Sequence, residues 1–223
     1  MRRILALTAL AACSALAATA ASGSTTSRFE QRIYSTGTDS RDYWLYVPSG
    51  YTGQRIPLVV VLHGCSQDAV SIARDTQFNE YAERDTFLVA YPNQPSSANA
   101  GQCWNWFLPE HQRRGSGEAA LIAGIATSVA QEFDVNPRRI HATGMSAGAA
   151  MSVIMGATYP DVFASIGVSA GLEYRAGEDL VSGVLAMQAG GPDPDTQGAL
   201  AFVEMGRSAR TLPRSLVAWP SQT

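Results

Sequence analysis

The sequence predicts an α/β fold with a mostly parallel sheet and helices on both of its faces. Residues 57–62 form a continuous run of β-branched and apolar side chains, which is typical of a strand covered on both faces. Further along the chain, segments of strand character at 87–91, 139–143 and 163–169 alternate with segments of helix character. This alternation favours parallel strands joined by helices.

The other elements follow from turn signals and helical periodicity. Residues 30–36 and 41–48 are predicted to pair as a hairpin, because turn-forming residues lie between them. The long polar and aromatic stretch 93–117 is predicted to be a loop, and a loop of this length inside a domain is usually functional. Helices are predicted over residues 68–85, 118–133, 147–159 and 195–209, and a weak final strand over residues 212–219.

Length and composition indicate one folded domain. The chain has 223 residues, of which 46% are hydrophobic and 16% charged, and its net charge is −3; this is enough to bury a sizeable core. Basic residues occur in short pairs rather than in a dense patch, so nucleic acid is not an expected partner. The sequence has no metal-ligand spacing and no nucleotide-binding loop, and we expect no cofactor. It gives no indication of the oligomeric state.

The first twenty residues have the pattern of an export signal. Residues 1–20 combine a basic start, a short apolar stretch and an A-x-A pattern, which predicts a signal peptide and a secreted protein. A second interpretation stays open, because residues 10–13 resemble a lipobox; Cys13 would then be lipidated and would anchor the chain to a membrane. Residues 21–28 are predicted to be a flexible linker, and residues 29–223 the folded domain.

One motif indicates the chemistry. Residues 144–148 read Gly-Met-Ser-Ala-Gly, a G-x-S-x-G pattern between a short apolar strand and an apolar helix. In that context the pattern is the sharp strand-to-helix turn that presents a nucleophilic serine in an α/β-hydrolase. Glycines flank the serine because a Cβ would clash in so tight a turn. We therefore predict an α/β-hydrolase fold with Ser146 as the nucleophile.

Backbone N–H groups near Ser146 are predicted to form an oxyanion hole. The N–H of Ala147 directly follows the serine, at the N-terminus of a predicted helix. A second N–H is expected from Cys65, in the loop that follows the third predicted strand. In this loop Gly64 lets the backbone approach closely, and His63 is expected to support the loop by packing or hydrogen bonding.

Two cysteines remain once the predicted signal peptide is removed. In an oxidising compartment Cys65 and Cys103 are expected to form a disulfide, the alternative being two buried free thiols. Cys103 also begins an aromatic run in which Trp104, Asn105 and Trp106 are candidates for contact with substrate. The alternative is a small core beneath the loop, and the two interpretations are compatible.

The histidines stand in an unexpected order. An α/β-hydrolase has its serine first, then the acid, then the histidine, whereas His63, His111 and His141 all precede Ser146. We interpret His141 as a core residue within a strand and His111 as a solvated residue. None of the three is therefore identified as the base of a catalytic triad.

Several stretches, taken in order along the chain, resemble one family of enzymes. They are residues 62–67 (Leu-His-Gly-Cys-Ser-Gln), 103–107 (Cys-Trp-Asn-Trp-Phe), 113–115 (Arg-Arg-Gly) and 144–151 (Gly-Met-Ser-Ala-Gly-Ala-Ala-Met). Together they are similar to the extracellular poly(3-hydroxybutyrate) depolymerases, a family that includes related feruloyl and acetylxylan esterases. The similarity runs from about Tyr43 to Arg210. It implies secretion, a disulfide between the two cysteines, and hydrolysis of polyhydroxyalkanoate or plant and short-chain esters through an acyl-enzyme.

The resemblance stops near the C-terminus. In the family, the strand after the helix that matches residues 195–209 ends in His-Gly-x-x-Asp, and a later segment carries the catalytic histidine. Here Trp219 and Pro220 stand where His-Gly is expected, and Thr223 stands where the aspartate is expected. The aspartates that follow the serine do not lie at the end of a predicted strand: Asp161, Asp179, Asp193 and Asp195. We therefore identify no triad acid or base, and we expect the last strand or strands and the closing helix of the fold to be missing.

These observations leave three hypotheses. The first is a secreted serine esterase with Ser146 as nucleophile. The second is a non-catalytic protein that binds an ester or a polymer on a hydrolase scaffold. The third makes an upstream histidine the base, and predicts that His63→Ala abolishes activity.

Overall fold

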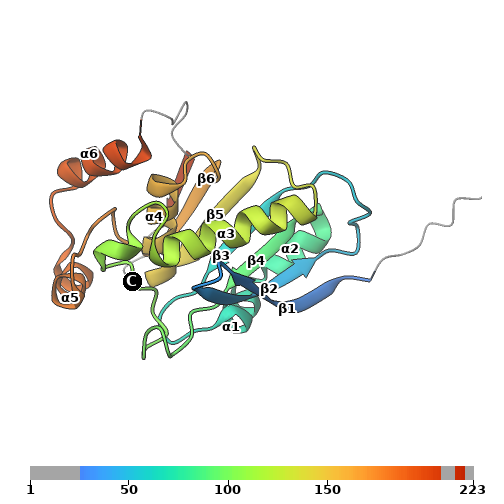
Figure 1. Cartoon of the computed structure of the whole chain (residues 1–223), viewed down its shortest axis with the longest axis horizontal. Helices are drawn as coiled ribbons and strands as arrows, with labels where there is room; N and C mark the ends of the chain where they lie inside the picture. The colour runs from blue at the N-terminus through green and yellow to red at the C-terminus, as the bar shows by residue number, and fades with distance from the viewer. Residues whose placement is uncertain (1–25, 207–213, 219–223) are drawn as a thin grey trace, which may run out of the picture.

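The computed structural model describes residues 26–206 and 214–218. Within these residues the chain forms a seven-stranded sheet in the order β1-β2-β4-β3-β5-β6-β7. The five strands β4, β3, β5, β6 and β7, in their order in the sheet, run parallel to one another. At one edge, β1 pairs with β2 and β2 pairs with β4 in antiparallel fashion. The predicted fold class is confirmed, since the sheet is mostly parallel and helices lie on both faces (Figure 1).

The antiparallel edge is the predicted hairpin. Strand β1 (Arg28–Ser35) pairs with β2 (Ser40–Val47), and β2 pairs with β4 (Leu88–Pro92). Strand β1 begins at Arg28, the last residue of the predicted linker. The predicted signal peptide, most of the linker and residues 219–223 lie outside the described residues.

The parallel part of the sheet contains the strands that carry the site. Strand β3 (Leu58–Leu62) lies between β4 and β5 (Ile140–Met145), and β6 (Ser165–Ser169) pairs with β5 and with β7 (Arg214–Ala218). The carboxyl ends of β3 and β5 therefore lie side by side, with Leu62 opposite Gly144. Ligands of open α/β sheets bind outside these carboxyl ends.

Helices cover the two faces unequally. Helices α3 (Gly117–Glu132) and α4 (Ala147–Thr158) share the main hydrophobic core with one face of the sheet. Helices α1 (Ala69–Thr76) and α2 (Phe78–Asp85) pack on the other face in a smaller core. Figure 1 shows α3 crossing in front of the sheet, with α1 and α2 on the opposite side.

The prediction of one helix over residues 68–85 is wrong. Gln77 has a positive φ of 56° and separates α1 from α2, serving as the C-cap of the first and the N-cap of the second. A residue in this left-handed conformation ends a helix. Hydrophobic periodicity alone did not reveal the break, because both short helices bury apolar residues on the same side.

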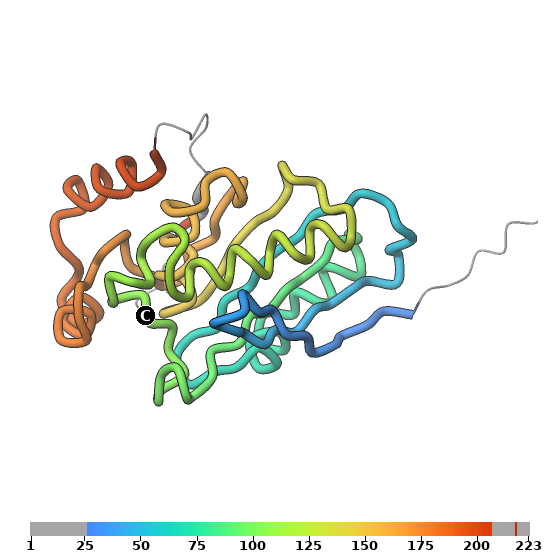
Figure 2. Tube along the Cα trace, viewed as in Figure 1, coloured from blue at the N-terminus to red at the C-terminus, as the bar shows by residue number. Residues whose placement is uncertain are grey.

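The region between β6 and β7 contains a helix that the sequence patterns did not predict. Helix α5 (Leu180–Ala189) is the unpredicted one and precedes α6 (Pro194–Met205). Elsewhere in the chain, between β4 and α3, the short 3-10 helix η1 (Pro109–His111) lies in the predicted long loop. Figure 2 shows α5 and α6 at the end of the molecule away from the hairpin. Among the described residues, no helix is long and apolar enough to cross a membrane.

Candidate active site

Ser146 occupies the turn between β5 and α4 in a strained conformation. Its φ is 54° and its ψ is −120°, values that a residue with a side chain rarely adopts and that cost on the order of 1–3 kcal/mol. The turn is held by a hydrogen bond of 2.9 Å from the Ser146 N–H to the carbonyl of Ser169 at the end of β6. The side chain is exposed, so the strand-to-helix turn presents it to solvent, as the motif predicts.

The glycines of the motif permit a close approach of the helix to the strands. A Cβ on Gly148 would overlap the carbonyl of Leu62 and lie 2.6 Å from the carbonyl oxygen of His63. A Cβ on Gly144 would lie 2.8 Å from Leu62 O and would also overlap Gly148. The first turn of α4 can therefore rest directly on the end of β3 only because both positions lack a side chain.

The loop after β3 lies beside the serine. A Cβ built on Gly64 would be 3.5 Å from Ser146 Cβ and 3.3 Å from the carbonyl of Met145. The Gly64 N–H donates to Gln67 Oε1 at 2.9 Å. Within the part of the chain that the structure describes, the N–H groups of Cys65 and Ala147 donate no hydrogen bond. Both are thus free to donate to an oxyanion near Ser146.

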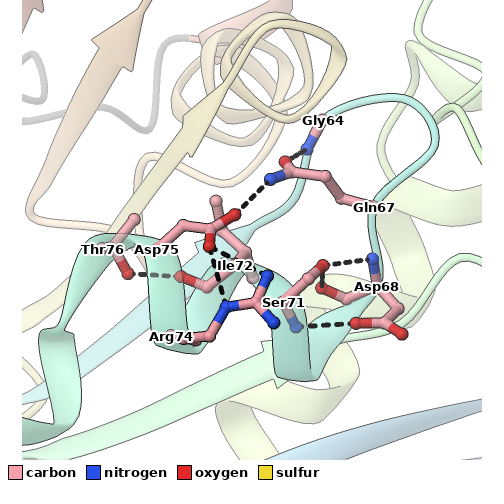
Figure 3. A network of polar contacts seen from close by, with 8 residues as sticks. All are labelled: Gly64, Gln67, Asp68, Ser71, Ile72, Arg74, Asp75 and Thr76. Carbon is pink, nitrogen blue, oxygen red and sulfur yellow. Dashed lines mark hydrogen bonds and ion pairs between the residues drawn. The ribbon is translucent and has the colours of Figure 1, made fainter.

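The surface side of this loop is tied to α1. Gln67 Nε2 donates to Asp75 Oδ2 at 3.0 Å, and Asp75 also pairs with its neighbour Arg74. At the start of α1, Asp68 accepts a hydrogen bond from the Ser71 N–H at 2.7 Å in a capping box. Figure 3 shows this network, in which the side chain of Gln67 bridges the loop backbone and the helix.

His63 supports the loop from the buried side. Its Nε2 accepts the backbone N–H of Gln94 at 3.0 Å, which places the ring proton on Nδ1, and Nδ1 donates to the carbonyl of Gly64 at 2.8 Å. Burial lowers the pKa of His63 and favours the neutral ring. Since both ring nitrogens are engaged, the arrangement contradicts the hypothesis that His63 is the base for Ser146.

The expected disulfide joins Cys65 to Cys103. It connects the loop after β3 to the long loop that follows β4, and a second contact reinforces the connection: the Ser66 N–H donates to the carbonyl of Gly101 at 2.8 Å. The predicted pairing is therefore present in the structure. The residue expected to supply an oxyanion donor is itself covalently fixed through its side chain.

A cavity of about 300 Å³ opens next to Ser146. Its described lining is apolar and combines small with large residues: Trp106, Ala147, Ala150, Ala170, Gly171, Leu172 and Met187 accompany Ser146. Of the three candidates for substrate contact, only Trp106 lines it. Trp104 is fully buried against the ring of His63, and Asn105 is buried and hydrogen bonded to Glu118. These two residues form the small core beneath the loop, which corrects their prediction as substrate contacts.

The comparison with family profiles identifies the chain. Residues 41–217 match the family described as Esterase PHB depolymerase. The chain belongs to this family. The assignment agrees with the resemblance drawn from the sequence motifs, and the matched residues include the Ser146 turn and the disulfide loop.

Named relatives of this esterase family share about a third of the aligned residues. Poly(3-hydroxyalkanoate) depolymerase C of Paucimonas lemoignei is 36% identical over 157 residues, which are 70% of this chain and 37% of the relative. Acetylxylan esterase A of Emericella nidulans is 31% identical over 137 residues, which are 59% of this chain and 44% of the relative. The chain thus spans less than half the length of these two relatives.

A solved structure supports the fold. The acetyl xylan esterase from Aspergillus awamori superposes with a TM-score of 0.73 at 22% identity, covering 86% of this chain and 71% of that enzyme. The S-formylglutathione hydrolase from Staphylococcus aureus gives a TM-score of 0.60 at 18% identity, covering 86% of this chain and 79% of that enzyme. The architecture is therefore that of an α/β-hydrolase.

The other histidines of this family member have structural partners. His141 Nδ1 lies 2.7 Å from Ser165 Oγ, between neighbouring strands β5 and β6, and burial lowers its pKa. His111 Nδ1 accepts the backbone N–H of Glu118 at 2.9 Å, and the residue is half-buried. The interpretation of His111 as a solvated residue is therefore wrong.

The aspartates that follow the serine are also engaged in local structure. Asp161 forms an ion pair with Arg114, and Asp179 and Asp193 cap the N-termini of α5 and α6. Asp195 lies in the first turn of α6. In the described part of the chain, no group of three or more His, Cys, Asp or Glu side chains is placed to hold a metal ion.

Sequence analysis did not single out Gln94, Glu118 or Met187. Gln94 and Glu118 are buried polar residues in contact with the loop elements, and Met187 comes from the helix that was not predicted. A buried glutamate at the start of an apolar helix is recognisable only from the structure, since acidic residues commonly occupy an exposed first turn.

Proposed function

We propose that this protein hydrolyses carboxylic esters through an acyl-enzyme on Ser146. In the proposed reaction Ser146 Oγ attacks the ester carbonyl carbon, the alcohol leaves, and water then releases the carboxylic acid. The N–H groups of Cys65 and Ala147 would donate to the oxyanion that forms at each step. The observation that carries the proposal is the strained turn that exposes Ser146 at the mouth of a cavity and beside the loop of Gly64.

The proposed substrates are esters of short acyl groups. The cavity beside Ser146 is only about 300 Å³, and Trp106, Leu172 and Met187 take up part of its apolar wall, so it has room for a short acyl chain. Apolar pockets with few polar groups are typical of small-ligand sites. The relatives named for poly(3-hydroxyalkanoate) and acetylxylan support the same substrate class, and we propose a polyhydroxyalkanoate or an acetylated polysaccharide as the natural ester.

A second candidate function is ester binding without turnover. Among the described residues, no ionisable side chain lines the cavity at Ser146, and the ring of His63 is fully engaged. A serine hydroxyl without an adjacent base is a weak nucleophile. Without a base, the oxyanion hole and substrate binding alone give a rate roughly 10³–10⁴-fold above that in water.

The two candidates are separated by the hydrolysis of a chromogenic butyrate ester by the purified protein. Ser146→Ala should abolish the activity above background. Ser165→Ala is the control: Ser165 Oγ lies 2.7 Å from Nδ1 of His141, unlike Ser146 it has a histidine partner in the structure, and it has no role in the proposal. Activity that is equal in the wild type and in Ser146→Ala would overturn the esterase proposal. Retained binding of a non-hydrolysable butyrate analogue would then support the second candidate.

We also propose that the protein acts outside the cytoplasm. The signal pattern of residues 1–20 and the disulfide between Cys65 and Cys103 support this location, since disulfides persist in oxidising compartments. Export followed by sequencing of the mature N-terminus tests it. A mature chain that begins at residue 21 is expected, whereas a lipidated N-terminus at Cys13 would indicate an anchored protein.

A further inference from the structure

Glu118 is a buried carboxylate that the proposed chemistry does not use. It is the second residue of α3 and is only 1% exposed. Its Oε1 accepts hydrogen bonds from Gln94 Nε2 at 2.6 Å and from Asn105 Nδ2 at 2.7 Å, while Oε2 accepts the Asn105 backbone N–H at 2.8 Å. All three partners are donors, so the group acts as an acceptor through both oxygens, which an ionised carboxylate does.

The charge of Glu118 has two sources of compensation. The carboxylate lies in the first turn of α3, where the helix dipole stabilises a negative charge. The guanidinium group of the buried Arg41 is close enough for an attractive interaction with it, and this guanidinium lies over the ring of Trp104. Nε and Nη1 of Arg41 have no hydrogen-bond partner among the described residues. A buried cation of this kind requires a nearby anion, and Glu118 supplies one, together with Asp42 and Asp39.

Gln94 connects this carboxylate to the loop after β3, which contains Gly64 and Cys65. Its side-chain Nε2 donates to Glu118 and also to the carbonyl of Cys103 at 3.0 Å. Its backbone N–H donates to Nε2 of His63, and the opposite nitrogen of that ring holds the carbonyl of Gly64. A continuous path of hydrogen bonds therefore leads from Glu118 to the residue that precedes Cys65.

The same carboxylate reaches Cys65 by a second route. The two hydrogen bonds from Asn105 fix the loop immediately after Cys103, and Cys103 is joined to Cys65 by the disulfide. One buried group thus constrains both the backbone before Cys65 and the side chain of Cys65. On the surface side, Gln67 accepts the Gly64 N–H and donates its own N–H to the Gly64 carbonyl at 3.3 Å; these contacts constrain the backbone before Cys65 but not its side chain.

We propose that Glu118 is a positioning residue for the oxyanion hole: through Gln94 and His63 on one side, and Asn105 and the disulfide on the other, it aims the Cys65 N–H toward the substrate. The inference rests on the proposed function of the Ser146 site. It goes beyond that function because Glu118 touches neither the cavity lining nor the reacting atoms. Its effect is to hold a donor, not to transfer a proton.

Glu118→Gln is the variant that tests this role. The replacement keeps the size of the side chain but turns one acceptor oxygen into an amide that faces a donor, so at least one of the three hydrogen bonds is lost. Glu132→Gln is the matched control on the same helix. Glu132 is the last residue of α3, is half exposed and pairs only with Arg32 among the described residues, far from the loop.

Two measurements report on the loop. The first is the ¹⁵N chemical shifts of the His63 ring, which we expect to show the Nδ1–H tautomer in the wild type and a mixture of tautomers in Glu118→Gln. The second is the rate at which Ser146 Oγ displaces fluoride from a short-chain alkyl fluorophosphonate. A donor displaced by about 1 Å costs about 10²-fold in rate, and we expect a fall of that order. Glu132→Gln should match the wild type in both measurements.

A control for stability separates positioning from a structural role. Val129→Ala removes buried side-chain volume from α3 without touching the hydrogen bonds of Glu118, and the rates are compared at temperatures equally far below each variant's Tm. A similar loss of labelling in Val129→Ala and Glu118→Gln would overturn the proposal, as would an unchanged His63 tautomer in Glu118→Gln. If the wild type itself is not labelled at Ser146, the proposed function fails, and the tautomer measurement still decides the role of Glu118 in the loop.

Discussion

Helices α4 and α5 have similar compositions and opposite surroundings. Both are built from apolar and small residues, and neither contains a charged side chain. In α4 every residue but Val153 is buried. In α5 only Gly183 and Ala186 are buried, while its large side chains are mostly exposed. The exposed set consists of Leu180, Val181, Val184, Leu185 and Met187.

The difference comes from where the small residues lie. In α4, Gly148 permits contact with the end of β3, and a Cβ on Gly156 would already be 3.1 Å from the side chain of Ile166 on β6. The helix therefore rests on the sheet and is covered by α3 and α6. In α5, the buried Gly183 faces Phe107 on the long loop, and the large side chains are exposed. Apolar composition makes burial favourable, but a partner surface must be present for burial to occur.

This contrast matters for the site. The buried helix carries Ser146 and Ala147 at its N-terminus, so the proposed nucleophile and one proposed oxyanion donor stand on a rigid support. The exposed helix contributes only Met187 to the cavity. Catalytic groups held by packed elements keep their geometry better than groups on loosely packed ones.

The largest expected effect comes from Gly→Ala substitutions, which compare the tightly packed α4 with the open surface of α6. Gly148→Ala in α4 places a methyl group against two backbone carbonyls and should destabilise the fold by about 3 kcal/mol or more. Gly198→Ala in α6 meets nothing within 4 Å and should stabilise it by about 0.5–1 kcal/mol, because alanine favours the helix. Denaturant unfolding measures both. Equal effects of the two variants would contradict the close approach of α4.

A methionine pair gives an intermediate effect. Met151 in α4 is fully buried, and Met187 in α5 is 55% exposed. Met151→Ala should reduce the free energy of unfolding by about 2–5 kcal/mol through the lost contacts and the cavity left behind. Met187→Ala should change it by less than about 0.5 kcal/mol. A loss of more than 2 kcal/mol in Met187→Ala would show that α5 is covered in solution.

The smallest effect on stability is expected at the exposed face of α5. Leu185→Gln should leave the free energy of unfolding within about 0.5 kcal/mol of the wild type, since Leu185 is 57% exposed. Binding of a dye that reports exposed apolar surface should fall, because the substitution interrupts the apolar face. Gln188→Ala, one turn along on the same exposed helix, is the control and should not reduce dye binding. Unchanged dye binding in Leu185→Gln would show that this face is not the accessible one.

Much of the fold could be predicted because its signals are local. The hairpin, the buried run of β3 and the strand–turn–helix around Ser146 each depend on neighbouring residues, and the structure contains all three. The break at Gln77 and helix α5 were not predicted. Gln77 adopts a left-handed conformation although it is not a glycine, so the sequence carries no glycine signal for the break. The start of α5 is marked in the sequence only by the capping box between Asp179 and Ser182.

The candidate site divides in the same way. Sequence reasoning identified Ser146 and the cysteine pair, whose roles are set by a motif and by cysteine count. It did not identify the burial of Trp104, because an aromatic residue in a loop has the same sequence signal whether it faces a cavity or a core. Only the stacking of Trp104 against His63 distinguishes the two cases.

The sequence by itself determined the fold class, the strand-to-helix turn at Ser146 and the pair of cysteines, since these follow from periodicity, a five-residue motif and composition. The tertiary structure alone decided which backbone donors stay free near Ser146 and which buried groups hold them. The bond from Gln94 to His63 spans 31 residues, and the bond from Gln94 to Glu118 spans 24. Contacts of that separation leave no pattern in the local sequence, because they form only when β3, β4 and α3 pack together and bring the loops after the two strands beside the start of the helix.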